Sequence, residues 1–197
     1  MLRRQISRWL AALLLFVATF LAAPVFADEA VPICFNYGCA AEQTTVFSEQ
    51  QLEWLRDIMS IADNAEQERA LVSLTLGRLY VWAGEQTPVA ADRGGNLADD
   101  GQPGSMDCID HSTTTTRFLL MMERHGALRF HRVLDVARRG VIWQHLSAQI
   151  EEIGPDLMHA ETEHIQRFAV DSWYVENGQP AIVLPIDEWK DGGGPDV

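Results

Sequence analysis

The sequence predicts an α+β fold, in which helices come first and a mostly antiparallel sheet follows. Two patterns support this prediction. Apolar side chains recur at helical spacing in three segments between residues 48 and 124, whereas beyond residue 127 they alternate as in strands. A third observation is the segment at 176–179, Glu-Asn-Gly-Gln, which is typical of a turn between two antiparallel strands.

The first 27 residues are predicted to be a cleavable secretory signal. Arg3 and Arg4 precede an apolar stretch, which closes at Val25 and Ala27. These two small side chains suit the −3 and −1 positions of a signal-peptidase site just before residue 28. We therefore expect an exported protein, periplasmic or secreted, whose mature chain forms one domain over 28–197.

Two other fates of this leader were weighed. A retained membrane anchor is disfavoured, because the unbroken apolar run is about 13 residues, short of the ~20 that span a bilayer. A lipid anchor on Cys34 is disfavoured, because Ile33 stands where a lipoprotein signal prefers a small residue. The mature protein is expected to be free of the membrane.

Charge narrows the range of partners. The leader contains three of the 15 basic residues and none of the 28 acidic ones, which leaves 12 against 28 and a formal charge of −16. Binding to a nucleic acid requires a basic surface, so nucleic acid is not expected as a partner. Anionic lipid headgroups are disfavoured for the same reason. The oligomeric state is left open.

The chain has three cysteines, Cys34, Cys39 and Cys108. Export implies an oxidising compartment, in which Cys34 and Cys39 are close enough in sequence to close a small loop. Asn36 and Gly38 supply turn chemistry within that loop. This pairing leaves Cys108 as a lone thiol, either reactive or buried and inert.

The helical part is expected over about 45–105, ahead of a Cys108 helix and sheet core at about 106–190. Ser48 and Gln51 match a capping box, which predicts a first helix. A second helix is expected from about residue 64 to 82, followed by a loop rich in glycine at 87–105. The third helix is expected at 106–124, although its run of four threonines disfavours a helix unless tertiary packing holds it.

Strands are expected at 128–136, 141–151, 167–175 and 181–184, with an inserted loop or short helix at 154–165. Alternation places Trp143, His145 and Ser147 on one face of the second strand, and Asp171 and Trp173 on one face of the third. If these strands pair, His145 and Asp171 lie opposite each other.

Cys108 is predicted to begin its helix, where free backbone N–H groups and a partial positive charge favour a thiolate and an oxyanion. A nucleophilic cysteine needs a base, and the base needs an orienting group. His145 and Asp171 supply both, in the chain order Cys, His, Asp. The alternative for each residue is a purely structural role.

The motifs around these residues resemble the transglutaminase-like superfamily, nearest to the bacterial transglutaminase-like cysteine peptidases of the periplasm. Met-Asp-Cys-Ile-Asp-His at 106–111 is similar to the motif of the nucleophile, Trp-Gln-His-Leu-Ser at 143–147 to the histidine strand, and Val-Asp-Ser-Trp at 170–173 to the aspartate strand. The resemblance covers roughly residues 100–190. It departs at His111, where these peptidases often have an aromatic residue, and in the long gap between His145 and Asp171.

The resemblance implies a papain-like helix-on-sheet core and a Cys-His-Asp triad that acts on amides of a protein or peptide substrate. Water as acceptor would make the protein a peptidase or amidase, and an amine would make it a transglutaminase. The alternative is a catalytically inactive binding domain of the same fold.

The remaining candidate residues lie around this triad. Gln102 is a candidate oxyanion donor, although a polar loop residue is more often simply solvated. Trp173 and Trp189 are candidate groove walls or core residues. Asp110 is expected to favour the helix start electrostatically. No cofactor or metal is expected, because the histidines lack ligand spacing and only His159 with Glu163 or His164 comes near it.

Overall fold

The computed structural model describes residues 28–95, 98–154 and 166–195. The predicted signal at 1–27 lies outside the described residues, as do the predicted insertion beyond Gly154 and the three residues of the weak metal alternative. Within the described segments, no helix combines the length and the apolar character needed to cross a bilayer.

The described chain opens with a β-hairpin that the sequence did not predict. Strands β1 (Glu29–Phe35) and β2 (Ala41–Phe47) pair antiparallel, and the predicted disulfide between Cys34 and Cys39 closes the turn between them. The helical part, expected from about residue 45, follows this hairpin and begins at Glu49. The sequence did contain a signal for β1: every second residue from 31 to 35 is apolar, and these residues are buried in the main core.

Two helices follow, as predicted. Helix α2 (Glu49–Ser60) begins with the expected capping box between Ser48 and Gln51. Helix α3 (Ala65–Gly84) is capped by the side chain of Asn64. The loop predicted at 87–105 contains one short 3₁₀ turn, η1 (Pro88–Ala91).

Helix α4 (Cys108–Arg124) is the third predicted helix and begins at the lone thiol. Its threonines are held by tertiary packing, as expected: Thr115 bonds to the hydroxyl groups of Tyr80 and Ser172, and Thr114 accepts a hydrogen bond from the backbone of Cys34. These bonds satisfy buried hydroxyl groups and offset the weak helix propensity of threonine.

The four predicted strands form one antiparallel sheet in the order β3-β4-β5-β6. Their bounds are β3 (His131–Arg139), β4 (His145–Glu152), β5 (Arg167–Asp171) and β6 (Ile182–Pro185), and a short helix α5 (Ile186–Lys190) follows. The predicted bounds were wrong for three strands. The first strand is shifted by three residues and spans 131–139 rather than 128–136. The second strand begins at His145 rather than at residue 141, and the third ends at Asp171 rather than at residue 175, where the chain turns away from the sheet.

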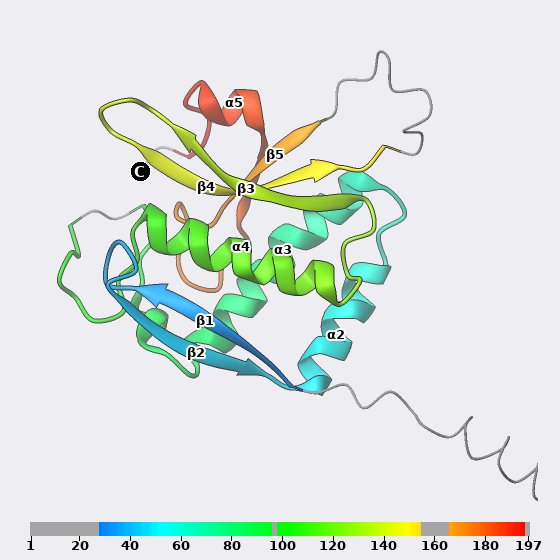
Figure 1. Cartoon of the computed structure of the whole chain (residues 1–197), viewed down its shortest axis with the longest axis horizontal. Coiled ribbons are helices and arrows are strands. Elements are labelled where there is room, and N and C mark those ends of the chain that lie inside the picture. The colour runs from blue at the N-terminus through cyan, green and yellow to red at the C-terminus, as the bar shows by residue number, and fades with distance from the viewer. Residues whose placement is uncertain (1–27, 96–97, 155–165, 196–197) are drawn as a thin grey trace, which may run out of the picture.

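The elements stack in layers (Figure 1). Helix α4 lies between the β1–β2 hairpin and one face of the sheet, and α5 covers the opposite face. The main core includes Phe118, Ile150 and Val170, and a smaller cluster around Trp189 and Ala169 lies under α5. This arrangement confirms the α+β class and the packing of the Cys108 helix on an antiparallel sheet.

A buried carboxylate joins α3 to the start of the sheet. Glu68 accepts backbone hydrogen bonds from Arg129 and Phe130 and bonds to Nδ1 of His131 at 2.9 Å. Both side chains of the Glu68–His131 pair are fully buried. Burial alone would raise the pKa of Glu68, but these hydrogen bonds outweigh it and the pKa is lowered.

We predict that Glu68→Gln destabilises the protein by about 3 kcal/mol at pH 7, because it leaves the neighbouring donors poorly satisfied. Since the folded-state pKa lies below the ordinary 4.5, the contribution is present above that value and lost as the pH falls below it. Urea unfolding between pH 7 and pH 3 measures this: the gap between the wild type and the variant should shrink in acid. A gap that is constant with pH would contradict this account.

Candidate active site

His145 and Asp171 meet at one end of the sheet. His145 is the first residue of β4 and Asp171 the last of β5, and Nε2 of His145 lies 2.6 Å from Oδ2 of Asp171. The strands pair with Ala148 opposite Val170, and the same register extended by one residue puts Asp171 opposite Ser147. His145 is therefore a diagonal neighbour of Asp171 on the same face, and not directly opposite it as expected.

Asp171 is held by two further hydrogen bonds. Its Oδ2 accepts from the indole Nε1 of Trp189 at 2.8 Å, and its Oδ1 accepts from the backbone N–H of Trp173 at 3.2 Å. Trp189 is fully buried in α5 and belongs to the smaller core cluster, so it is a core residue and not a groove wall, and its indole also holds Asp171. A tryptophan at the far end of the chain carried no sequence signal for this role, because the contact depends on α5 folding back onto β5.

Cys108 lies beside the same histidine. Its sulfur is 3.9 Å from the backbone carbonyl of Gln144, the residue before His145, and it is close enough to the imidazole to help raise the pKa of His145. Because Asp171 occupies Nε2, the ring nitrogen left for the thiol is Nδ1. The thiol is partly exposed, so the structure brings all three predicted residues together and leaves the sulfur accessible.

The charge state of His145 follows from these contacts. Burial disfavours the imidazolium, but the hydrogen bonds to Asp171 and Cys108 and the charges of both groups outweigh burial and raise the pKa of His145 to about 9. At neutral pH the ring is therefore charged, and Asp171 holds the Nε2 proton. This is the state in which the ring stabilises a thiolate and has a proton to give at Nδ1.

Aromatic rings surround the imidazole. The ring centroids of Trp173, Tyr174 and Trp189 lie 4.9, 5.5 and 5.7 Å from that of His145. The indole Nε1 of Trp173 is buried and has no hydrogen-bond partner in the part of the chain that the structure describes. An unmade bond of this kind is costly, so Trp173 offers a free donor beside the imidazole.

The start of α4 is not the open set of N–H groups that the sequence suggested. The carboxylate of Asp107 accepts from the backbone N–H groups of Ile109 and Asp110, and the carbonyl of Asp107 accepts from His111. The capping box thus occupies the N–H groups of Ile109 and Asp110, and a helical bond occupies that of His111. These three groups are not open to an oxyanion as the sequence suggested.

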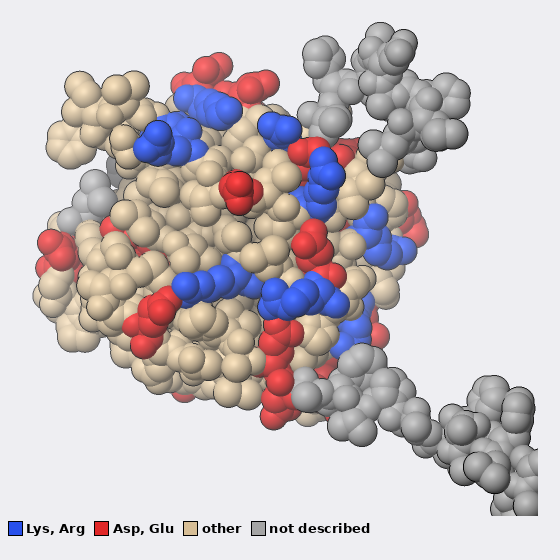
Figure 2. All heavy atoms as spheres, in the orientation of Figure 1, with Lys and Arg blue, Asp and Glu red and all other residues tan. Residues whose placement is uncertain are grey.

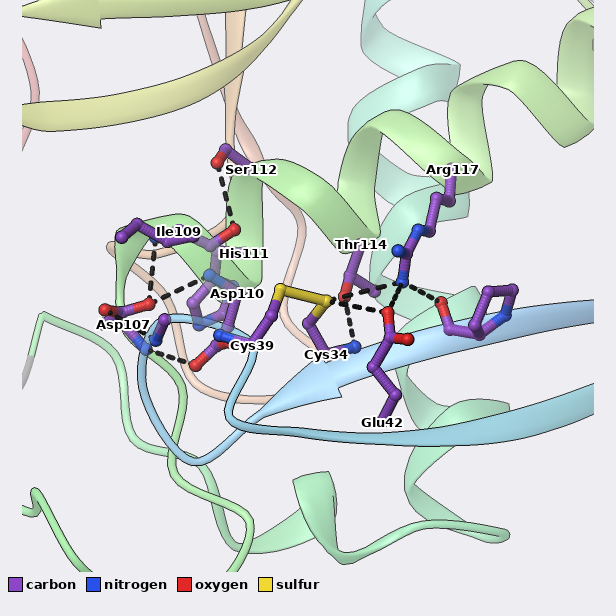
Figure 3. The surroundings of a disulfide bond; sticks show 12 residues. Cys34, Cys39, Glu42, Asp107, Ile109, Asp110, His111, Ser112, Thr114 and Arg117 are labelled. Carbon is purple, nitrogen blue, oxygen red and sulfur yellow. Dashed lines mark hydrogen bonds and ion pairs between the residues drawn. A yellow bond between two sulfur atoms is a disulfide. The ribbon is translucent and has the colours of Figure 1, made fainter.

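Asp110 does more than favour the helix start. It is fully buried and accepts backbone hydrogen bonds from Tyr37 at 2.8 Å and Cys39 at 2.6 Å, and Asp107 accepts one from Gly38 at 3.0 Å. Figure 3 shows how the disulfide loop closes over the beginning of α4. Burial and the charge of Asp107 raise the pKa of Asp110 to about 6, against the backbone hydrogen bonds that lower it.

The disulfide loop has an unusual backbone. Four consecutive residues from Asn36 to Cys39 have φ between 55° and 66°, and only one of them is glycine. Each non-glycine residue in this region costs on the order of 1 kcal/mol or more. Successive left-handed residues also aim their N–H groups to one side, which forms a concave anion site. Here that site is filled by the carboxylates of Asp107 and Asp110, on either side of Cys108 in the chain.

A buried polar network lies behind the thiol helix. Nε2 of His111 is 3.0 Å from Asp92 and its Nδ1 is 2.9 Å from the hydroxyl of Ser172, while Asp92 also accepts from the backbone of Met106. His111 thus ties α4 to the residue that follows Asp171. These contacts account for a buried polar residue at position 111 of the helix.

The other predicted residues do not join the triad. Gln102 is exposed, and the described residues show no hydrogen bond between it and the triad; its backbone carbonyl accepts from Ser105. The acidic and sulfur groups of Cys34, Cys39 and Asp110 lie close together, but both sulfurs are used in the disulfide. A hollow of about 500 Å³ lies elsewhere, lined by residues such as Phe168 and Ile186.

We predict that the imidazole of His145 titrates near pH 9 and that Asp171→Asn moves this pKa down toward the ordinary 6.5. The reason is that the amide removes the negative charge that favours the imidazolium. Histidine NMR titration measures it, with His125→Gln as a control that identifies an unrelated resonance. An unchanged His145 titration in Asp171→Asn would contradict this account.

We also predict that the double variant Cys34→Ala, Cys39→Ala loses about 2 kcal/mol of stability, the amount expected for a short closed loop. The left-handed residues of the loop are then held by the carboxylates alone. Urea unfolding without reductant measures the loss, and a reductant should lower the stability of the wild type but not that of the variant. Equal stabilities of wild type and variant would refute the role of this loop as a brace.

Comparison of the chain with protein-family models, with curated protein sequences and with solved structures finds no match in any of the three.

Proposed function

We propose that this protein is an exported thiol enzyme that transfers the acyl group of an amide to Cys108. The observation that carries the proposal is one imidazole between two groups: Nε2 of His145 bonds to Asp171 at 2.6 Å, and the thiol of Cys108, 3.9 Å from the carbonyl of the preceding Gln144, is near enough to raise the pKa of the same ring. A nucleophile, a base and an orienting carboxylate in this order form the minimal unit of covalent amide catalysis.

The first half of the reaction follows from these contacts. The thiolate of Cys108 attacks the carbonyl carbon of the amide, and an oxyanion forms. As the C–N bond breaks, the imidazolium of His145 gives its Nδ1 proton to the leaving amine. An acyl thioester on Cys108 and a neutral imidazole remain, and Asp171 keeps the Nε2 proton in place throughout.

The second half resolves the thioester. Neutral His145 takes a proton from water or from an amine as that group attacks the thioester, and the sulfur leaves as thiolate. Water gives hydrolysis, as in a peptidase or amidase, and an amine gives transamidation. Both routes restore the ion pair of Cys108 and His145 and consume no cofactor.

The capping box occupies the N–H groups of Ile109 and Asp110, so these two groups cannot serve the oxyanion and another donor is required. The indole Nε1 of Trp173 is the better candidate: it is buried, it has no hydrogen-bond partner among the described residues and its ring lies against His145. Gln102 is the weaker one, because its side chain stands in an exposed turn. A donor kept free of water is worth more to an oxyanion than a solvated one.

The arrangement of elements supports the resemblance to the transglutaminase-like superfamily. The nucleophile begins a helix packed on an antiparallel sheet, and the histidine and aspartate lie on neighbouring strands in the expected order. The bacterial periplasmic peptidases of this superfamily are the nearest group by motif. Export rests on the leader sequence at 1–27, ahead of the described residues.

Activity is tested with the mature protein and a bacterial periplasmic extract. New amino termini report hydrolysis, and incorporation of a biotinylated amine reports transamidation. Wild-type protein is expected to produce one of the two, Cys108→Ala neither, and Asp171→Asn at least 100-fold less.

Cys108→Ser is the matched control, because it keeps the size of the side chain and removes the thiol. A thioester trapped on Cys108 in mass spectra would support the proposal. Product formation that persists in Cys108→Ala would refute it, and a wild type that forms no product and no thioester would indicate the alternative, an inactive binding domain.

A further inference from the structure

The loop that joins β3 to β4 exposes three consecutive apolar residues. Val141, Ile142 and Trp143 are 90%, 87% and 89% exposed. The loop projects from the body of the molecule at the upper left of Figure 1, and the same corner of Figure 2 carries no charged side chains at its tip. Single exposed apolar residues are ordinary, but a contiguous group marks a surface that meets a partner.

This tip is connected directly to the candidate active site. The residue after Trp143 is Gln144, whose carbonyl lies 3.9 Å from the Cys108 sulfur, and the next residue is His145. Ile109, the residue that follows Cys108 in the chain, is 40% exposed. Exposed apolar residues thus stand close in sequence to both the nucleophile and its base.

Residues 141–143 at this tip belong to neither a strand nor a core cluster of the described residues. The prediction that Trp143 shares a strand face with His145 was wrong, because β4 begins at His145 and leaves Trp143 in the loop. Neither of the two core clusters includes any of the three residues. Contact with a ligand would remove the apolar surface of all three side chains from water, which favours binding.

We infer that residues 141–143 bind a bulky apolar side chain of a polypeptide substrate, next to the amide that Cys108 attacks. The inference rests on the proposed function and adds a substrate class: chains that expose aromatic or aliphatic residues, as extended and unfolded polypeptides do. A projecting tip suits such a chain, because an extended chain can contact the tip without having a preformed hollow to receive it. The formal charge of −13 disfavours an anionic bilayer as the occupant.

The test uses two peptidyl chloromethyl ketones, acetyl-Ala-Ala-Phe and acetyl-Ala-Ala-Glu, which alkylate an active thiol while presenting one side chain beside it. Iodoacetamide, which presents none, reports the thiol itself. The wild type is expected to react at least tenfold faster with the Phe reagent than with the Glu reagent. The double variant Ile142→Ser, Trp143→Ser should lose most of this preference and keep its iodoacetamide rate within twofold.

Leu74→Ser is the matched control, because Leu74 is an exposed apolar residue of α3 and should change neither rate. Equal rates of the wild type with the Phe and Glu reagents, or a Phe preference that survives in the double variant, would overturn the inference. If Cys108 reacts with none of the three reagents, the proposed function fails, and the tip is then judged by binding alone.

Binding is measured with Cys108→Ala protein and reduced, carboxymethylated α-lactalbumin, an unfolded chain. Saturable binding that the double variant loses supports the inference, and binding unaffected by the double variant, or no binding, overturns it. Sedimentation with phosphatidylglycerol vesicles and sedimentation velocity of the protein alone complete the test. A tip-dependent association with vesicles or between copies of this chain, without binding of the unfolded chain, assigns the tip to a membrane or a dimer instead.

Discussion

The candidate site depends on the hydrogen bonds that the buried carboxylate of Asp171 accepts. This carboxylate lies at the last residue of β5 and accepts from His145, Trp189 and the backbone of Trp173. Three donors around one buried carboxylate offset the cost of burying its charge, and they fix its position relative to β4 and α5. The imidazole is then oriented by a group that cannot rotate away, and the charge of Asp171 helps keep the ring protonated at neutral pH.

The thiol is positioned by a different device. Helix α4 begins at Cys108, and the residues on both sides of that start, Asp107 and Asp110, hold the backbone of the disulfide loop. The loop carries four left-handed residues, a conformation that the disulfide and the carboxylates together maintain. His111 adds a contact from the same helix to Ser172, next to Asp171. The nucleophile and its orienting group are thus joined through buried polar bonds as well as through the sheet.

Much of this could be predicted from the sequence, because the signals were local. The capping box at Ser48, the start of the second helix near residue 64 and the alternation of the strands depend on neighbouring residues, and the ordered Cys, His and Asp followed from helix start and strand pattern. What could not be predicted depends on distant contacts. Trp189 reaches Asp171 only because α5 folds onto the sheet, and Asp110 meets residues more than 70 positions away. The N-terminal hairpin was missed because the segment between Cys34 and Cys39 was interpreted only as a loop closed by a disulfide, and not as the turn between two strands.

The central claim is that His145 and Asp171 activate Cys108, and the rate at which iodoacetamide alkylates the thiol at pH 7 tests it most directly. Alkylation should be at least tenfold faster in the wild type than in His145→Ala, because removing the imidazolium withdraws the charge that stabilises the thiolate. Asp171→Asn should fall between the two. Equal rates in the wild type and His145→Ala would show that the thiol is not activated by its neighbours and would contradict the account.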